Sequence, residues 1–244
     1  YYRLVWTGFL VPPESGTYRL AIRGPTAKLV LDGRTLAEQR FAPWGTRSEW
    51  ATVELEKGKH YPIEVSTEAH LLAGIELLWK RISTRPEADL AAAAERADVI
   101  VAAVGLTSDL EGEEMPIEIE GFSGGDKTSI DLPEDQRRLL ERAASFGKPL
   151  IVVLMNGSTL DVSWAKEHAS AIIEAWYPGE VGGLAIGNVI AGKVNPAGRL
   201  PLTFYRSVAD LPAFDDYSMK GRTYRYFTGS PVYPFGYGLS YSTF

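Results

Sequence analysis

An acidic run between residues 110 and 126 holds the side chains best suited to proton-transfer chemistry. The segment reads LEGEEMPIEIEGFSGGD, and its five glutamates fall within ten residues: Glu111, Glu113, Glu114, Glu118 and Glu120. A carboxyl group pressed against other carboxylates keeps its proton to a higher pH than usual, which suits it to general acid–base catalysis. The same run could instead be a cation site or a solvated loop, which is the commonest use of clustered charge.

The spacing of these carboxylates does not fit a metal site. An EF-hand loop needs Asp or Asn at alternating positions and glycine at its sixth place, which LEGEEMPIEIEG does not provide. The chain has no cysteine, and its histidines, His60, His70 and His168, lie far apart, so zinc-ligand spacings are missing. The turn GEVGG matches no nucleotide-binding pattern. We therefore predict neither a metal nor a cofactor.

Composition argues against two further classes of partner. A formal net charge of −6 with no basic stripe argues against nucleic acid. No apolar run approaches the ~20 residues of a membrane helix, and the first residues carry no signal-peptide pattern, so we predict no membrane partner. The absence of cysteine does not fix the compartment; we favour a secreted or periplasmic bacterial protein over a cytoplasmic one. The sequence leaves a homo-oligomer open.

Residues 1–81 have the pattern of an antiparallel β-sandwich. Short segments with period-2 alternation are separated by turn signals, of which Asp32-Gly33 is a strong two-residue hairpin signal. No helix of useful length is evident there. Trp6 and Trp79 fall in alternating strands, and we expect both to lie in the core.

Residues 82–244 change to β-α alternation, which predicts a parallel sheet covered by helices. Alanine-rich and amphipathic helical segments alternate with short apolar runs of strand length, and a Pro-, Gly- and Tyr-rich tail should wrap over a neighbouring surface. The fold class is thus α/β plus all-β: a parallel-sheet α/β sandwich domain (82–244) preceded by an antiparallel β-sandwich module (1–81). The helical segments are 88–97, 132–147 and 180–192, and the strand segments are 97–106, 148–158 and 170–179.

The predicted sheet brings the acidic run to a functional edge. In open α/β sheets, ligand-binding loops follow the carboxyl ends of the strands. The acidic run follows the first apolar strand, Asn156-Gly157-Ser158 follows the second and Tyr177-Pro178-Gly179 follows the third. We expect these segments to meet at one rim, which favours a functional carboxylate over a solvated loop.

Several long motifs resemble glycoside hydrolase family 3. AWYPGEVGGLAIGNVIAGKVNPAGRLP, GRTYRYF and YPFGYGLSYSTF are similar to the C-terminal α/β domain of that family, and LEGEEM with GGDKTSIDLP is most similar to its bacterial β-xylosidase/β-glucosidase branch. WTGFLVPPESGTYRLAI and LVLDGRTL resemble the protective-antigen-type β-sandwich module that some members carry as an insertion. The resemblance implies that this sequence enters the module in the middle of a strand.

The resemblance implies part of a retaining, exo-acting β-xylosidase or β-glucosidase. Members of the family have an N-terminal (β/α)8 barrel that supplies an aspartate nucleophile, and no barrel of about 250 residues fits here. The C-terminal domain lends its acid/base glutamate to the barrel, so the implied partners are that barrel and a β-linked glycoside. We expect the isolated chain to be inactive, since it lacks the nucleophile.

The resemblance does not single out one glutamate. The short-loop pattern laid without a gap on VGLTSDLEGEE puts the acid/base on Glu113, whereas alignment from EGFSGGDK favours Glu120, and Glu114 is a third candidate. In PIEIEGF, Glu118 and Glu120 alternate like the exposed face of a strand edge, which favours the first cluster and hence Glu113. Asp126 and Lys127 are expected to hold the loop in shape.

A non-catalytic function is the alternative. Sandwich modules of this type bind glycans or stand near an active site, and Trp44 and Trp50 are candidates for a lip over substrate. Such a carbohydrate-binding or adhesion fragment would need no barrel. An upstream barrel in the same protein would discriminate between the two functions.

Overall fold

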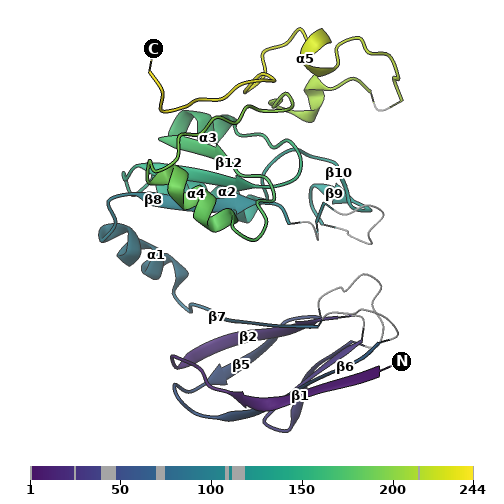
Figure 1. Cartoon of the computed structure of the whole chain (residues 1–244), viewed down its shortest axis with the longest axis vertical. Helices are drawn as coiled ribbons and strands as arrows, with labels where there is room; N and C mark the ends of the chain where they lie inside the picture. The colour runs from purple at the N-terminus through teal and green to yellow at the C-terminus, as the bar shows by residue number, and fades with distance from the viewer. Residues whose placement is uncertain are drawn as a thin grey trace. The chain divides into compact units, whose positions relative to one another are not determined.

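The computed structural model describes residues 2–24, 26–39, 48–69, 75–107, 110–111, 119–213 and 215–243. The chain divides into two compact units, Tyr1–Leu90 and Ala91–Phe244. The first is built of antiparallel strands and the second contains a parallel sheet with helices (Figure 1). The predicted fold class, α/β plus all-β, is confirmed.

Two antiparallel sheets make up the first unit. One has the strand order β1-β6-β3-β4 and the other β5-β2-β7. Leu20, Ile22 and Leu29 are fully buried between these strands, as period-2 alternation predicts. The strands are β1 (Tyr2–Leu10), β2 (Gly16–Arg23), β3 (Ala27–Leu31), β4 (Arg34–Gln39), β5 (Ala51–Leu55), β6 (Tyr61–Ala69) and β7 (Glu76–Arg81).

The Asp32-Gly33 hairpin forms as predicted. It joins β3 to β4, and both residues have positive φ, 50° and 76°. Positive φ at both central positions is the requirement of a two-residue turn whose twist matches the flanking strands.

The expectation that Trp6 and Trp79 lie in the core is wrong. Trp6 pairs with Val65 and Trp79 pairs with Leu20, so each tryptophan stands in the row that faces the core. However, β1 and β7 are the outer strands of their sheets, and the two side chains are 47% and 38% exposed. Trp79 stacks on the Tyr18 ring, with centroids 5.4 Å apart.

The second unit is organised on a three-stranded parallel sheet, ordered β12-β11-β8. Its strands are β8 (Ile100–Gly105), β11 (Leu150–Met155) and β12 (Ala171–Glu174). Its main helices are α1 (Pro86–Glu95), which begins in the first unit, α2 (Glu134–Ala144), α3 (Ser163–His168) and α4 (Gly182–Ile190). Two short strands, β9 (Phe122–Ser123) and β10 (Asp126–Lys127), form a hairpin, and η2 (Val208–Asp210) and α5 (Thr223–Tyr226) are short helices.

The C-terminal tail packs onto this sheet unit, as expected. Phe204 and Val232 are each 1% exposed and belong to the same apolar core as the buried residues of β11. Lys166 of α3 donates from Nζ to the Val232 carbonyl at 2.7 Å, and Figure 1 shows the yellow tail running beside α3. The tail therefore completes the core.

Gln136 ties α2 to the end of β8. Its side-chain amide donates to the Gly105 carbonyl at 2.8 Å, and its side-chain oxygen accepts from the Gly105 N–H at 2.7 Å. Gly105 has φ +141°, and a Cβ there would lie 2.0 Å from the Met155 carbonyl oxygen. Glycine is required at this position because β11 approaches so closely.

Among the helices of the described ranges, none has the length and apolar character needed to cross a membrane.

Candidate active site

The parallel sheet brings three loop segments to one edge. Gly105, at the end of β8, lies opposite Met155 of β11, and Leu154 lies opposite Glu174 at the end of β12. The backbone N–H of Glu111 donates to the Thr107 carbonyl at 3.1 Å, and the Leu110 side chain packs against the apolar core. The root of the acidic run is therefore held at the carboxyl edge.

Glu111 is the centre of this edge. Its Oε2 accepts from the Gly157 N–H at 2.7 Å and from the Tyr177 hydroxyl, and its Oε1 accepts from the Ser158 hydroxyl. Its side chain is only 10% exposed. We name Glu111, Lys127, Gly157, Ser158 and Tyr177 the rim cluster. The prediction that the segments after the three strands meet at one rim is confirmed.

Lys127 connects the β9–β10 hairpin to the rim. Its Nζ donates to Ser158 Oγ at 3.0 Å and to the Thr159 carbonyl at 2.7 Å, and lies 4.0 Å from Glu111 Oε1. The side chain is 15% exposed, so little water screens the charges. The expected role of Lys127 in shaping the loop agrees with these contacts.

The rim cluster stabilises the charged form of Glu111. Burial alone raises the pKa of the Glu111 carboxyl, but hydrogen bonds from Ser158, Tyr177 and Gly157, together with the Lys127 charge, outweigh burial and lower that pKa below 4.5. Burial and the adjacent carboxylate raise the pKa of Tyr177. Burial lowers the pKa of Lys127 against the opposing effect of Glu111. At neutral pH the cluster therefore holds a carboxylate against neutral donors and one buried ammonium.

A second carboxyl group on this edge has the opposite character. Burial raises the pKa of Glu174 to about 7, assisted by the Glu111 charge and opposed by hydrogen bonds from the Trp176 N–H and the Asn156 side chain. Within the part of the chain that the structure describes, Glu174 Oε2 and the Oδ1 of fully buried Asn156 have no hydrogen-bond partner. Trp176, between Glu174 and Tyr177, has φ +52°. Such backbone strain is concentrated at functional sites.

Of the three predicted acid/base candidates, the structure describes only Glu120. Glu113 and Glu114, like Glu118, lie outside the described residues. Glu120 is exposed in the turn before β9. Within the described ranges, no group of Asp, Glu or His could hold a metal ion.

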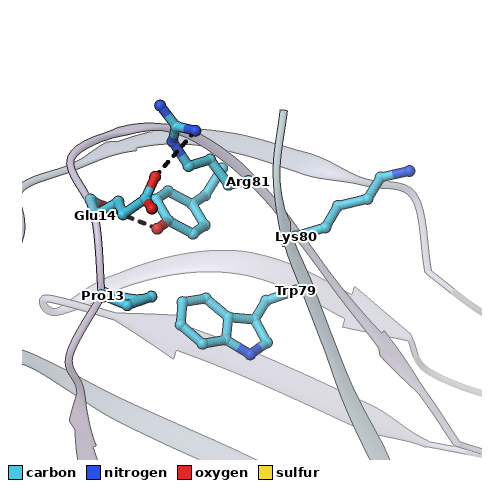
Figure 2. A pocket seen from close by; sticks show the side chains of 6 residues that line it. Pro13, Glu14, Trp79, Lys80 and Arg81 are labelled. Carbon is cyan, nitrogen blue, oxygen red and sulfur yellow. Dashed lines mark hydrogen bonds and ion pairs between the residues drawn. The ribbon is translucent and has the colours of Figure 1, made fainter. Parts of the chain in front are cut away.

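The proposed tryptophan lip is only partly described. Trp44 lies outside the described residues, and Trp50 is partly buried beside β7, where Lys80 Nζ stands 5.3 Å from its ring centroid. Trp79, in contrast, faces an open hollow of about 400 Å³. Figure 2 shows Trp79 beside Pro13, with Glu14 and Arg81 above them. Arg81 Nη1 lies 3.2 Å from Glu14 Oε2.

Sequence reasoning missed the role of Glu111 and did not mark Glu174. Both residues stand at or just after the carboxyl end of a parallel strand, where a carboxyl group meets the side chains of the neighbouring loops. The available signal for Glu111 was its place nearest to β8 among the five glutamates.

A family model and several known proteins match this chain. The model of the glycosyl hydrolase family 3 C-terminal domain matches residues 10–241. A xylan 1,4-beta-xylosidase of Xylanibacter ruminicola is 41% identical over 206 residues, which cover 82% of this chain and 24% of that protein. A periplasmic beta-glucosidase of Salmonella typhimurium is 40% identical over 164 residues, covering 62% of this chain and 20% of that protein.

Solved structures give the same result. The beta-glucosidase of Kluyveromyces marxianus, solved in complex with glucose, has a TM-score of 0.78 and 26% identity, covering 99% of this chain and 30% of that one. The chain thus spans between a fifth and a third of these relatives' lengths. Because the family model covers residues 10–241, the chain belongs to glycosyl hydrolase family 3, as a part that contains the family's C-terminal domain.

Proposed function

We propose that this chain is the part of a retaining, exo-acting β-glycosidase that supplies the general acid/base to a (β/α)8 barrel domain elsewhere in the same protein. The bond cleaved is the O-glycosyl bond of a terminal β-xylosyl or β-glucosyl unit at the non-reducing end. The observation that carries the proposal is the position of the acidic run, which is rooted through Glu111 at the carboxyl edge of β8, β11 and β12.

The chemistry needs two carboxyl groups with different protonation states. In a retaining glycosidase, a carboxylate nucleophile attacks the sugar, while a carboxylic acid about 5–5.5 Å away protonates the departing oxygen. The carboxylate left by that acid then acts as a base and takes a proton from the water molecule that releases the sugar from the enzyme. A carboxyl group can do this only if it still holds a proton near neutral pH before the first step.

This requirement helps to choose among the glutamates. Glu111 does not meet it, because three hydrogen-bond donors hold its carboxylate and its pKa is lowered. Glu120 is exposed, whereas an acid/base works in a site closed to water. We therefore assign the acid/base to Glu113, with Glu120 and Glu114 as alternatives; the nucleophile is an aspartate of the barrel.

The sugar is a xylose or a glucose. The relatives near 40% identity are named as a β-xylosidase and a β-glucosidase, and this supports both to a similar degree. The barrel holds the groups that bind the terminal sugar, so the choice between the two sugars requires the full-length protein.

The test uses the full-length protein and a series of aryl glycosides. Wild-type protein should hydrolyse p-nitrophenyl β-xyloside or β-glucoside with retention of configuration. Glu113→Gln should lower turnover of glycosides with poor leaving groups by about 10²–10⁴-fold, because these need protonation. Dinitrophenolate leaves without needing a proton, so dinitrophenyl glycosides should still form the glycosyl-enzyme rapidly in this variant, and its hydrolysis should become the slow step. Azide, which attacks the glycosyl-enzyme without needing a base, should restore part of the turnover.

The matched control is Glu141→Gln, an exposed residue of α2 remote from the acidic run in sequence. It should hydrolyse both classes of substrate like wild type. Normal turnover of poor leaving groups by Glu113→Gln would transfer the role to Glu120 or Glu114, which the same assay identifies. Failure of the full-length wild type to hydrolyse either sugar would refute the proposal and favour the carbohydrate-binding alternative.

A further inference from the structure

We infer that Glu111 is a positioning residue: a carboxylate anchor that fixes the root of the acidic run, two residues before the proposed acid/base Glu113 in the sequence. The inference rests on the proposed function, because it assigns a role to the neighbour of the acid rather than to the acid itself. It assigns the five residues of the rim cluster to one task.

The hydrogen bonds of Glu111 are those of an anchor. Its two carboxylate oxygens accept from Gly157, Ser158 and Tyr177, which lie 46, 47 and 66 positions further along the chain. Charge-assisted hydrogen bonds are about twice as strong as neutral ones. Because the donors come from the ends of β11 and β12, the carboxylate joins the loop after β8 to both neighbouring strands.

The same contacts exclude Glu111 from donating a proton. A general acid must carry its proton in the ground state and point it at the leaving oxygen. The carboxylate of Glu111 is instead surrounded by donors and is 10% exposed, with Lys127 Nζ 4.0 Å from Oε1. Protonation would place a hydrogen against these donors and leave the buried ammonium without its partner.

The packing around the carboxylate is tight enough to fix a position. A Cβ on Gly157 would lie 3.1 Å from Glu111 Oε2 and 2.7 Å from Cε2 of the Tyr177 ring. The absence of a side chain at residue 157 therefore lets the backbone N–H approach the carboxylate.

The charge of Glu111 has a second consequence. A carboxylate disfavours ionisation of another carboxyl group nearby, so it helps that group to retain its proton. Among the residues that the structure describes, the charged and titratable groups facing Glu111 are Lys127, Tyr177 and Glu174. Lys127 offsets part of the negative charge, and removal of the carboxylate leaves the ammonium unopposed.

The test compares Glu111→Gln with Glu141→Gln in the full-length protein, using substrates with good and poor leaving groups. We expect Glu111→Gln to lower kcat/KM for both classes by about 100-fold, since small misplacements of a catalytic group have effects of that size. Azide should give no rescue, because the acid/base carboxyl is still present. The basic limb of the pH–rate profile should move to lower pH by about one unit, because a negative charge is lost.

Two milder variants keep the test valid if Glu111→Gln does not fold. Tyr177→Phe and Ser158→Ala each remove one donor and retain the carboxylate. They should therefore lower kcat/KM by about three- to tenfold and leave the basic limb close to its wild-type position. Wild-type rates in both would overturn the inference.

The remaining outcomes separate the two proposals. Rescue of Glu111→Gln by azide, with poor leaving groups affected far more than good ones, would make Glu111 the acid itself and overturn the inference. A folded Glu111→Gln with an unchanged rate and pH profile would also overturn it, while hydrolysis by the wild type would leave the proposed function standing. Absence of hydrolysis by the wild type would instead mark the failure of the proposed function.

Discussion

Replacing Glu174 with glutamine should change how the stability of the chain depends on pH. The folded-state pKa of Glu174 is raised from 4.5 to about 7, chiefly by burial. Between these values the folded protein holds a proton that the unfolded chain releases. Stability must therefore fall as pH rises through this window, and above about pH 7 the buried charge lowers stability by its full amount.

The raised pKa sets the size of the effect. At about 1.4 kcal/mol per pH unit, the rise from 4.5 to about 7 corresponds to about 3.5 kcal/mol, and partial exposure of the side chain to water reduces this figure to about 3 kcal/mol or less. Glutamine is neutral throughout and keeps an oxygen that can accept from the Trp176 N–H.

The assay is urea unfolding of the chain between pH 4.5 and pH 8 at constant ionic strength. Glu174→Gln should match the wild type at pH 4.5 and exceed its free energy of unfolding by up to about 3 kcal/mol at pH 8. The control, Glu141→Gln, replaces an exposed glutamate by the same chemistry and should follow the wild-type curve. A difference between Glu174→Gln and wild type that stays constant with pH would refute the reasoning, since it would mean that Glu174 is ionised in the folded protein.

Two further substitutions test the packing that builds the rim. Gly157→Ala should destabilise the chain by about 1–3 kcal/mol in thermal unfolding, because its Cβ would displace the Tyr177 ring. The control, Gly183→Ala in α4, adds a Cβ that meets open space and should be neutral or stabilising. Equal effects of the two substitutions would contradict the close approach at Gly157. Gln136→Leu should lower the free energy of unfolding by about 2–4 kcal/mol, because it leaves both the N–H and the carbonyl of Gly105 without a partner. Gln136→Glu keeps only the acceptor and should lower it by roughly half as much. A Gln136→Leu variant that unfolds like the wild type would refute the role of Gln136 in tying α2 to β8.

The fold was predictable where a local pattern determines the outcome. Strands such as β11 are continuous apolar runs buried on both faces: the successive residues Val152 and Val153, which point to opposite faces, are 0% and 2% exposed. The Asp32-Gly33 turn depends only on the positive φ that these two residues accept. In α2, acidic residues in the first turn and Gly147 beyond the end mark its bounds.

The errors arose where an outcome depends on neighbouring strands. Alternation correctly predicts the face of Trp6 and Trp79, since they pair with the buried residues Val65 and Leu20. It does not indicate which strands lie at the edge of a sheet. Both tryptophans stand on such strands, and this accounts for their exposure.

The candidate site has the same limit. Strand order and apolar runs place the acidic run at the carboxyl edge, but they cannot distinguish one glutamate from the next. The distinction comes from donors that lie 46 to 66 positions away, on loops whose approach is set by the sheet. Neither Tyr177 nor Ser158 carries a motif that identifies it as a partner of Glu111.

The two carboxyl groups that the structure describes at this edge are driven to opposite protonation states. Glu111 receives donors on both oxygens, whereas Glu174 has one oxygen without a partner in the described part of the chain. Ionising Glu174 would add a second negative charge close to Glu111, and this repulsion contributes to its raised pKa. Below about pH 7 the pair therefore carries close to one charge, held on the group that has donors. Pairs of carboxyl groups whose pKa values are shifted in opposite directions are common in sites that transfer protons. By the same effect, the Glu111 charge would help any further carboxyl group brought close to it to retain its proton, which is what the proposed acid/base requires.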